Sequence, residues 1–195
     1  MPITSEKFKT GYYFKKQDNR NPIVFIHGVG LKKEMWTPQI EFFKDHSVLT
    51  YDLIGHGETP LKKTQLNFED FTKQLLNLID ELDLKSIHLI GFSLGSLIAR
   101  HFAAKHENRL SSLVLHASIY NRSPEQKRVV ENRYELIKTD RPASKDTALR
   151  RWFSEEFIRN NEEIYDKIYS MLEENDHNNL LKAYKLFVYY EDDDE

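Results

Sequence analysis

The first 118 or so residues alternate short apolar runs with glycine turns and amphipathic segments. Short, nearly all apolar runs at 23–26, 48–51 and 87–90 predict buried strands, and a shorter run at 113–115 predicts a fourth. Residues 12–15 predict one arm of an N-terminal hairpin. Strands that are apolar on both sides are typical of a sheet covered on both faces by helices.

The segments between these runs have helical spacing. Residues 67–82 place apolar side chains three or four positions apart after Asn67, which can cap a helix. Residues 35–44 predict a helix with Pro38 in its first turn, and another helix should end near His106. Strands that alternate with helices at these distances predict βαβ units, so the fold class is α/β with a mostly parallel sheet.

Residues 119–190 contain no glycine and have a different texture. Helical patterns recur at 129–137, 148–157, 164–172 and 180–188, and none of them adds a strand. We therefore expect three parts. They are an α/β core at 1–118, a helical cap at 119–190 that lies over the sheet, and a solvated acidic end at 191–195.

Composition and charge exclude several classes of function. The 28 basic and 31 acidic residues are spread along the chain, without the basic stripe and interleaved aromatics of a nucleic-acid binder. No apolar run reaches 18 residues and the N-terminus lacks the apolar core of a signal peptide, so we expect a cytoplasmic protein with no membrane partner. Without cysteine there is neither a disulfide nor a thiolate nucleophile. No pair of histidines lies at metal-ligand spacing together with a carboxylate, so we expect no metal and no cofactor.

The sequence Gly91-Phe92-Ser93-Leu94-Gly95 carries the strongest chemical signal. It fits the pattern G-x-S-x-G and lies between a predicted strand and a predicted helix. Glycine on both sides lets the backbone crowd into a sharp turn that exposes the serine hydroxyl. We therefore expect Ser93 to be a nucleophile; the structural alternative is an ordinary serine-bearing turn.

A second signal is His27-Gly28-Val29-Gly30, directly after the first buried run. Acyl transfer needs two backbone N–H donors aimed at the developing oxyanion. The residue after the nucleophile, Leu94, supplies one donor, and Val29 is the candidate for the other. A plain glycine turn is the structural alternative.

The same residues also suggest a nucleotide site. Gly28-x-Gly30, followed by Asp52 after the next strand, imitates a dinucleotide-binding fingerprint. However, Lys33 occupies the third glycine position, where close packing of helix on strand requires glycine. The nucleotide interpretation also leaves the serine turn unexplained, so we reject it.

Residues 52–59 form a third motif, Asp52-Leu53-Ile54-Gly55-His56-Gly57-Glu58-Thr59. Asp52 can accept hydrogen bonds from backbone N–H groups of this loop. Because Asp52 and His56 both belong to a tight turn, we predict structural rather than catalytic roles for them.

Together, the motifs at 27–30, 52–59 and 91–96 resemble the α/β-hydrolase superfamily, and within it 3-oxoadipate enol-lactonase and related small esterases. The resemblance runs from about residue 8 to the end of the chain. It implies an α/β-hydrolase fold with a helical cap. Residues 118–126 are similar to the start of that cap, and Arg151-Trp152-Phe153 looks like part of it, which implies that Trp152 helps to set substrate size.

The resemblance also narrows the chemistry. Haloalkane dehalogenases and epoxide hydrolases place aspartate where this chain has Ser93. Serine leaves esterases, lactonases, C–C hydrolases, acyltransferases and cofactor-free haloperoxidases open. Ser96 departs from the glycine common at that position of the family.

The rest of the family's triad is not apparent. The family's order is serine, then an acid after a strand that follows the cap, then a histidine after the last strand. This sequence ends within the cap, so we expect a truncated chain without the triad acid and histidine and with an open, apolar sheet edge prone to association. His116 is the best local substitute, but no acid is placed to orient it, and we expect a core or loop role. We expect no catalytic role for His101, His106 or His177.

Two hypotheses of function follow. The first is a serine hydrolase that cleaves a small carboxylic ester or lactone through an acyl-enzyme on Ser93, inactive in the truncated form. The second is a non-catalytic, ligand-binding relative, or pseudoenzyme, that keeps the pocket without the chemistry.

Overall fold

The computed structural model describes residues 3–4, 9–17 and 20–191 and divides into two compact units, Met1–Ile119 and Tyr120–Glu195. The acidic end predicted at 191–195 lies, beyond Glu191, outside the described residues.

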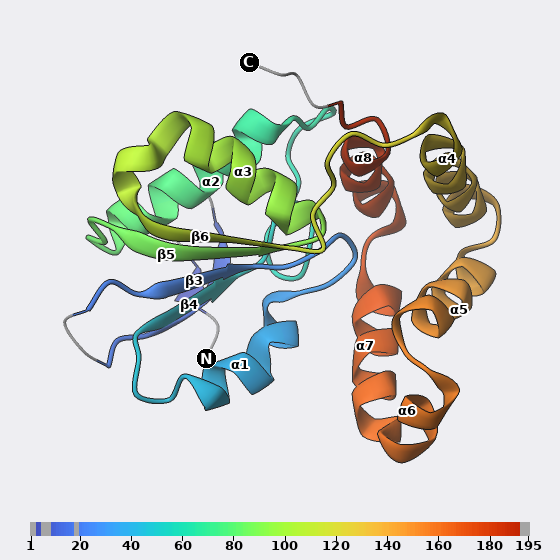
Figure 1. Ribbon diagram of the computed structural model, residues 1–195, viewed down its shortest axis with the longest axis horizontal. Helices are drawn as coiled ribbons and strands as arrows, with labels where there is room; N and C mark the ends of the chain where they lie inside the picture. The colour runs from blue at the N-terminus through green and yellow to red at the C-terminus, as the bar shows by residue number, and fades with distance from the viewer. Residues whose placement is uncertain (1–2, 5–8, 18–19, 192–195) are drawn as a thin grey trace. The chain divides into compact units, whose positions relative to one another are not determined.

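The first unit is built on one sheet of six strands in the order β1-β2-β4-β3-β5-β6. Figure 1 labels four of them, β4, β3, β5 and β6. The strands are β1 (Ile3–Thr4), β2 (Gly11–Lys15), β3 (Ile23–Ile26), β4 (Val48–Tyr51), β5 (Ile87–Phe92) and β6 (Leu110–His116). Strands β4, β3, β5 and β6 run parallel, and β2 joins them antiparallel beside β4. β2 also pairs antiparallel with β1, as expected for a hairpin. The mostly parallel sheet confirms the predicted fold class.

Helices lie on both faces of this sheet. Helices α2 (Phe68–Glu81) and α3 (Leu94–His106) cover one face, and α1 (Thr37–Phe42) covers the other (Figure 1). A short 3-10 turn, Glu107–Arg109, joins α3 to β6. At the start of α2, Asn67 Oδ1 accepts from the Asp70 N–H at 2.9 Å, while Asp70 Oδ2 accepts from the Asn67 N–H at 3.1 Å. This reciprocal capping explains why the helix begins where Asn67 predicts.

The helix predicted at 35–44 is shorter than expected. Residues Lys33–Trp36 form a 3-10 turn, and α1 begins only at Thr37, which puts Pro38 in its first turn. Proline is tolerated there but not further into a helix, so the predicted position of Pro38 is confirmed. Residues 35 and 36 belong to the 3-10 turn, and the α-helix ends at Phe42, two residues before the predicted end. This face of the sheet is packed with aromatic side chains, including Phe25 of β3 with its ring centre 4.7 Å from that of Trp36.

Strand β6 forms the other end of the sheet. Its three central apolar side chains are far from buried: Leu113 is 37% exposed, Val114 48% and Leu115 38%. Within the described residues no strand pairs with its outer side. The apolar edge that the sequence predicts is therefore present.

The second unit is helical, and its described residues contain no strand. Its helices are α4 (Pro124–Thr139), α5 (Arg141–Trp152), α6 (Glu155–Asn160), α7 (Glu162–Glu174) and α8 (His177–Val188). The single helix predicted at 148–157 is wrong, because α5 ends at Trp152 and Ser154 caps α6, its Oγ accepting from the Phe157 N–H at 3.2 Å. A serine hydroxyl that bonds nearby backbone competes with a continuous helix. No helix of the described chain is both long and apolar enough to cross a bilayer.

Candidate active site

Ser93 is the single residue between the end of β5 and the start of α3. Its backbone has φ 54° and ψ −119°, a conformation that costs a non-glycine residue about 1–3 kcal/mol. The Ser93 N–H donates to the His116 carbonyl at 3.0 Å, and the Ser93 carbonyl accepts from the Ser96 hydroxyl at 2.6 Å. The turn is thus held from both sides, and Ser96, where the family often has glycine, makes one of these bonds.

The two glycines of the motif are required by close backbone contacts. A Cβ on Gly91 would lie 2.2 Å from the Gly95 carbonyl oxygen, and a Cβ on Gly95 would lie 2.5 Å from the Ile26 carbonyl oxygen. Any side chain would therefore push the start of α3 away from the sheet. These contacts fix Ser93 at the carboxyl end of β5, beside the end of β3.

The loop after β3 lies directly against this turn. A Cβ on Gly28 would be 3.3 Å from Ser93 Cβ and 3.1 Å from the ring of Phe92. Val29 follows and is half-buried. Leu94 is the first residue of α3, where backbone N–H groups have no partner within the helix. The structure therefore brings Ser93, Leu94 and the Val29 loop into one neighbourhood.

Two histidines tie this loop to the loop after β4. His27 Nε2 accepts from the Leu53 N–H at 2.9 Å, and His56 Nε2 accepts from the Gly30 N–H at 3.1 Å. Each ring therefore carries its proton on Nδ1, which faces the carbonyl of Gly28 or Ile54. Burial is the main cause that lowers the pKa of both, and that of His56 falls to about 3. Both rings are neutral braces, in line with the structural role predicted for His56.

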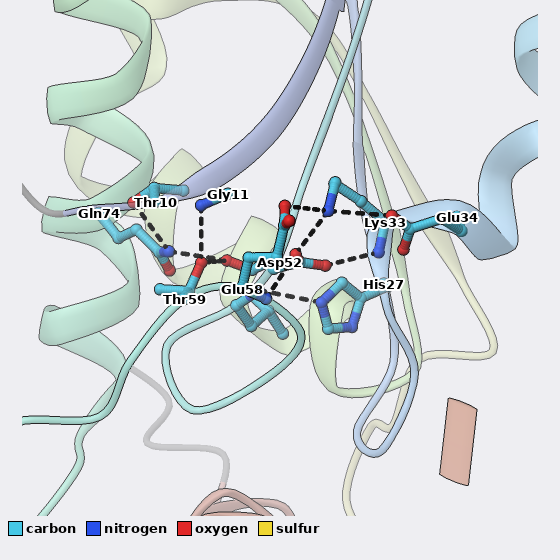
Figure 2. A network of polar contacts seen from close by, with 10 residues as sticks. Thr10, Gly11, His27, Lys33, Glu34, Asp52, Glu58, Thr59 and Gln74 are labelled. Carbon is cyan, nitrogen blue, oxygen red and sulfur yellow. Dashed lines mark hydrogen bonds and ion pairs between the residues drawn. The ribbon is translucent and has the colours of Figure 1, made fainter. Parts of the chain in front are cut away.

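Asp52 lies at the centre of a buried polar network (Figure 2). Its carboxylate is 0% exposed and accepts from the Lys33 N–H, the Lys33 ammonium and the Glu58 N–H at 2.9–3.0 Å. The Lys33 ammonium also contacts Glu58 and Glu34, each at 2.9 Å. Burial alone would lower the pKa of Lys33, but its hydrogen bonds to Asp52 and Glu58 outweigh this and raise it. Asp52 thus braces its turn, as the sequence predicts.

The Asp52 backbone is held as firmly as its side chain. The Asp52 carbonyl accepts from the Thr59 hydroxyl at 2.8 Å and from Gln74 Nε2 at 2.9 Å, and Thr59 Oγ1 in turn accepts from the Gly11 N–H (Figure 2). Gln74 projects from α2. The loop after β4 is therefore anchored to β2, α2 and the loop after β3.

No histidine of the described chain is hydrogen-bonded to the Ser93 side chain. The His116 ring stacks on Phe92 with ring centres 5.5 Å apart, and His101 shares a 2.8 Å hydrogen bond with Thr72. The His106 ring packs against Phe102 at 5.0 Å, and His177 begins α8 in the second unit. In the same residues no three His, Asp or Glu side chains are grouped for metal binding.

Trp152 ends α5 in the second unit and is 38% exposed. The Arg151 guanidinium lies 5.9 Å above its ring. Its role in substrate binding remains a prediction.

Two contributors to this framework escaped the sequence reasoning. In the sequence, Lys33 drew notice only because it occupies the third glycine position of a dinucleotide-binding fingerprint, and Gln74 drew none. Asp52 was the signal that could have revealed them. A buried carboxylate requires a cation or several hydrogen-bond donors, so such partners had to be present elsewhere in the chain.

Comparison with known proteins agrees with this geometry. The family model described as alpha/beta hydrolase fold matches residues 21–191. The chain is 32% identical over 151 residues to (E)-2-((N-methylformamido)methylene)succinate hydrolase of Acinetobacter baylyi, covering 77% of this chain and 57% of that protein. It is 24% identical to 3-oxoadipate enol-lactonase 2 of the same organism, covering 85% and 62%. The chain thus spans less than two thirds of the length of these relatives.

Solved structures give the same result. The enol-lactonase from Burkholderia xenovorans LB400 superposes with a TM-score of 0.79 at 26% identity, covering 92% of this chain and 71% of that one. A hydrolase from Pseudomonas aeruginosa PA01 superposes with a TM-score of 0.82 at 20% identity, covering 93% and 69%. With the serine turn and the loop beside it, these matches show that the chain belongs to the α/β-hydrolase family.

Proposed function

We propose that the protein is a serine hydrolase that cleaves a small carboxylic ester or lactone through an acyl-enzyme on Ser93. The backbone of Ser93 carries the proposal. Its strained conformation, maintained by the close contacts at Gly91 and Gly95, is hard to explain unless the hydroxyl must be displayed at the end of the sheet. The enol-lactonase and succinate hydrolase relatives support this substrate class through their names.

In the proposed reaction Ser93 Oγ attacks the substrate carbonyl carbon and passes its proton to a base. The carbonyl oxygen becomes an oxyanion that accepts hydrogen bonds from the N–H groups of Leu94 and Val29. Collapse expels the alcohol, which takes up the proton, and water then hydrolyses the acyl-enzyme by the same steps.

The scheme requires a base that takes the Ser93 proton, and we propose that a histidine oriented by an acid fills this role. Among the described residues, no histidine is hydrogen-bonded to the Ser93 side chain.

Labelling with a serine-directed fluorophosphonate tests the nucleophile in the native protein. We expect the reagent to modify Ser93, and the Ser93→Ala variant to lose both labelling and ester hydrolysis. Ser111→Ala, which changes an exposed serine of β6, is the matched control and should retain both. Hydrolysis that survives Ser93→Ala would contradict the mechanism.

The lack of a histidine bonded to Ser93 also favours a second candidate, a non-catalytic ligand-binding relative. A folded native protein that the fluorophosphonate does not label would support that candidate.

A further inference from the structure

Ser93 and Leu94 are joined by a peptide unit that carries a donor of the proposed reaction. The peptide bond is trans, so the Ser93 carbonyl and the Leu94 N–H lie in one plane and point in opposite directions. A group that fixes the direction of the Ser93 carbonyl therefore also fixes the direction of the Leu94 N–H. In the proposed reaction this N–H donates to the oxyanion, so its direction bears directly on the rate.

The Ser93 carbonyl is held chiefly by Ser96, the third residue of α3. The Ser96 N–H donates to this carbonyl at 2.9 Å and the Ser96 hydroxyl donates at 2.6 Å. A regular α-helix would instead bond this carbonyl to the Leu97 N–H, which is 3.4 Å away, beyond the roughly 2.7–3.2 Å usual for such bonds. The first turn of α3 is thus tight, and its short bonds to the Ser93 carbonyl both come from Ser96.

Packing leaves the Ser96 hydroxyl little freedom. Ser96 is 0% exposed, and its Cα lies so close to the strand that a Cβ on Gly91 would be 2.7 Å from it. Serine often bonds back to a carbonyl of the preceding helical turn without further consequence. Here, however, that carbonyl belongs to the peptide unit of the proposed oxyanion donor. A glycine at this position would leave the carbonyl with backbone donors alone.

We infer that Ser96 is a positioning residue, whose hydroxyl acts through the Ser93 carbonyl to orient the Leu94 N–H and to strengthen it as an oxyanion donor. An amide oxygen that accepts a further hydrogen bond polarises the amide, and its N–H becomes a better donor. The Ser93 side chain makes no capping bond at the start of α3, so it does not compete for these groups. The inference rests on the proposed function, because the oxyanion forms only if Ser93 attacks a carbonyl.

Ester hydrolysis by the native protein and its Ser96→Ala variant tests the role, with 4-nitrophenyl acetate as the probe. Loss of a whole oxyanion donor costs about 100- to 1000-fold in kcat, and here the donor remains without its support, so we expect kcat to fall about tenfold. The interaction strengthens only in the transition state, so kcat/KM should fall equally and KM should stay the same. Ser96→Cys, whose thiol is a weaker donor, should lie between the wild type and Ser96→Ala.

The matching thionoester, 4-nitrophenyl thionoacetate, separates this role from general damage to the fold. Its sulfur replaces the carbonyl oxygen and is a weak hydrogen-bond acceptor, so Ser96→Ala should slow its hydrolysis by less than about twofold. Equal slowing of the two esters would mean that Ser96 only supports the fold and would overturn the inference. The rate of fluorophosphonate labelling should fall in parallel with hydrolysis of the oxygen ester.

Thr37→Ala is the matched control. The Thr37 hydroxyl also bonds a carbonyl three residues back, that of Glu34 at 2.7 Å, so the variant loses the same kind of bond elsewhere in the first unit and should keep wild-type kinetics. If the wild type is labelled and active but Ser96→Ala is as fast as Thr37→Ala, the positioning role is overturned and the proposed function stands. If the wild type is neither labelled nor active, the proposed function fails, and the positioning role fails with it.

Discussion

His27 and His56 each accept a hydrogen bond from the backbone of the other's loop. The Leu53 N–H donates to His27 Nε2, the Gly30 N–H donates to His56 Nε2, and the two ring centres are 5.2 Å apart in an edge-on arrangement. The loops after β3 and β4 are therefore fixed to one another. Val29 lies between His27 and Gly30, so the direction of its N–H depends on this pair of bonds.

The first prediction concerns the His56 bond. His56→Leu removes the ring nitrogen that accepts from the Gly30 N–H and should lower the free energy of unfolding by about 1–3 kcal/mol. It should also slow fluorophosphonate labelling of Ser93, because the Val29 loop loses its brace. His56→Gln supplies an amide oxygen and should lose less on both measures. Urea denaturation measures the free energy of unfolding, and the rate of fluorophosphonate labelling measures the reactivity of Ser93. A His56→Leu protein that equals the wild type in both quantities would contradict the prediction.

The second prediction is a pH dependence of stability. Burial and the neighbouring His27 lower the pKa of His56 from 6.5 to about 3 in the folded protein. Between pH 6.5 and pH 3 the His56 ring binds a proton in the unfolded chain but not in the folded one. The contribution of neutral His56 to the free energy of unfolding is therefore complete above pH 6.5 and is lost as the pH falls. His56→Gln should therefore lose about 2 kcal/mol less than the wild type between pH 6.5 and 5.0. Urea unfolding at the two pH values measures the difference, and equal losses would show that His56 titrates normally.

The third prediction concerns the ion pair between Lys33 and Asp52. Lys33→Met leaves the fully buried Asp52 carboxylate without its cation and should lower the free energy of unfolding by about 3–5 kcal/mol. Adding Asp52→Asn removes the unpaired charge and should restore part of the loss. Lys44→Met, at an exposed position, is the control and should change little. Additive effects of Lys33→Met and Asp52→Asn in unfolding measurements would contradict a direct coupling.

The strands that the sequence predicted best are those buried on both faces. β3 and β4 have the predicted bounds because every residue in them is buried, and Thr50 is the one polar residue in their two runs. β6 is longer than its predicted core of three residues, since its exposed edge position admits Ser111 and Ser112, which interrupt the apolar pattern.

In the candidate site, contacts between residues close in the sequence were predictable, and contacts between distant residues were not. The turn at Ser93 was predictable because the glycines that permit it are adjacent in the sequence. The network around Asp52 was only half visible: its bond to the Glu58 N–H is local, but Lys33 and Gln74 reach it from 19 and 22 residues away. Those contacts depend on how β3, β4 and α2 pack, which no local pattern specifies.

The last prediction tests whether Ser93 is under strain. At φ 54° and ψ −119° a Cβ is unfavourable, and glycine adopts this conformation more easily. Ser93→Gly should therefore be more stable than Ser93→Ala by about 1 kcal/mol, after allowing for the greater freedom of glycine in the unfolded chain. The control is the same comparison at Ser96, three residues later in regular helix: Ser96→Gly and Ser96→Ala both lose the hydroxyl, and here the glycine variant should be the less stable.

Both Ser93 variants lack the hydroxyl, so neither should react with a fluorophosphonate, and urea unfolding gives the comparison of stability. A Ser93→Gly protein no more stable than Ser93→Ala would mean that the turn is relaxed. A more stable Ser93→Gly protein would show that the wild-type chain is less stable because it exposes this hydroxyl in a strained turn. Such a loss of stability is expected only where the hydroxyl has a function.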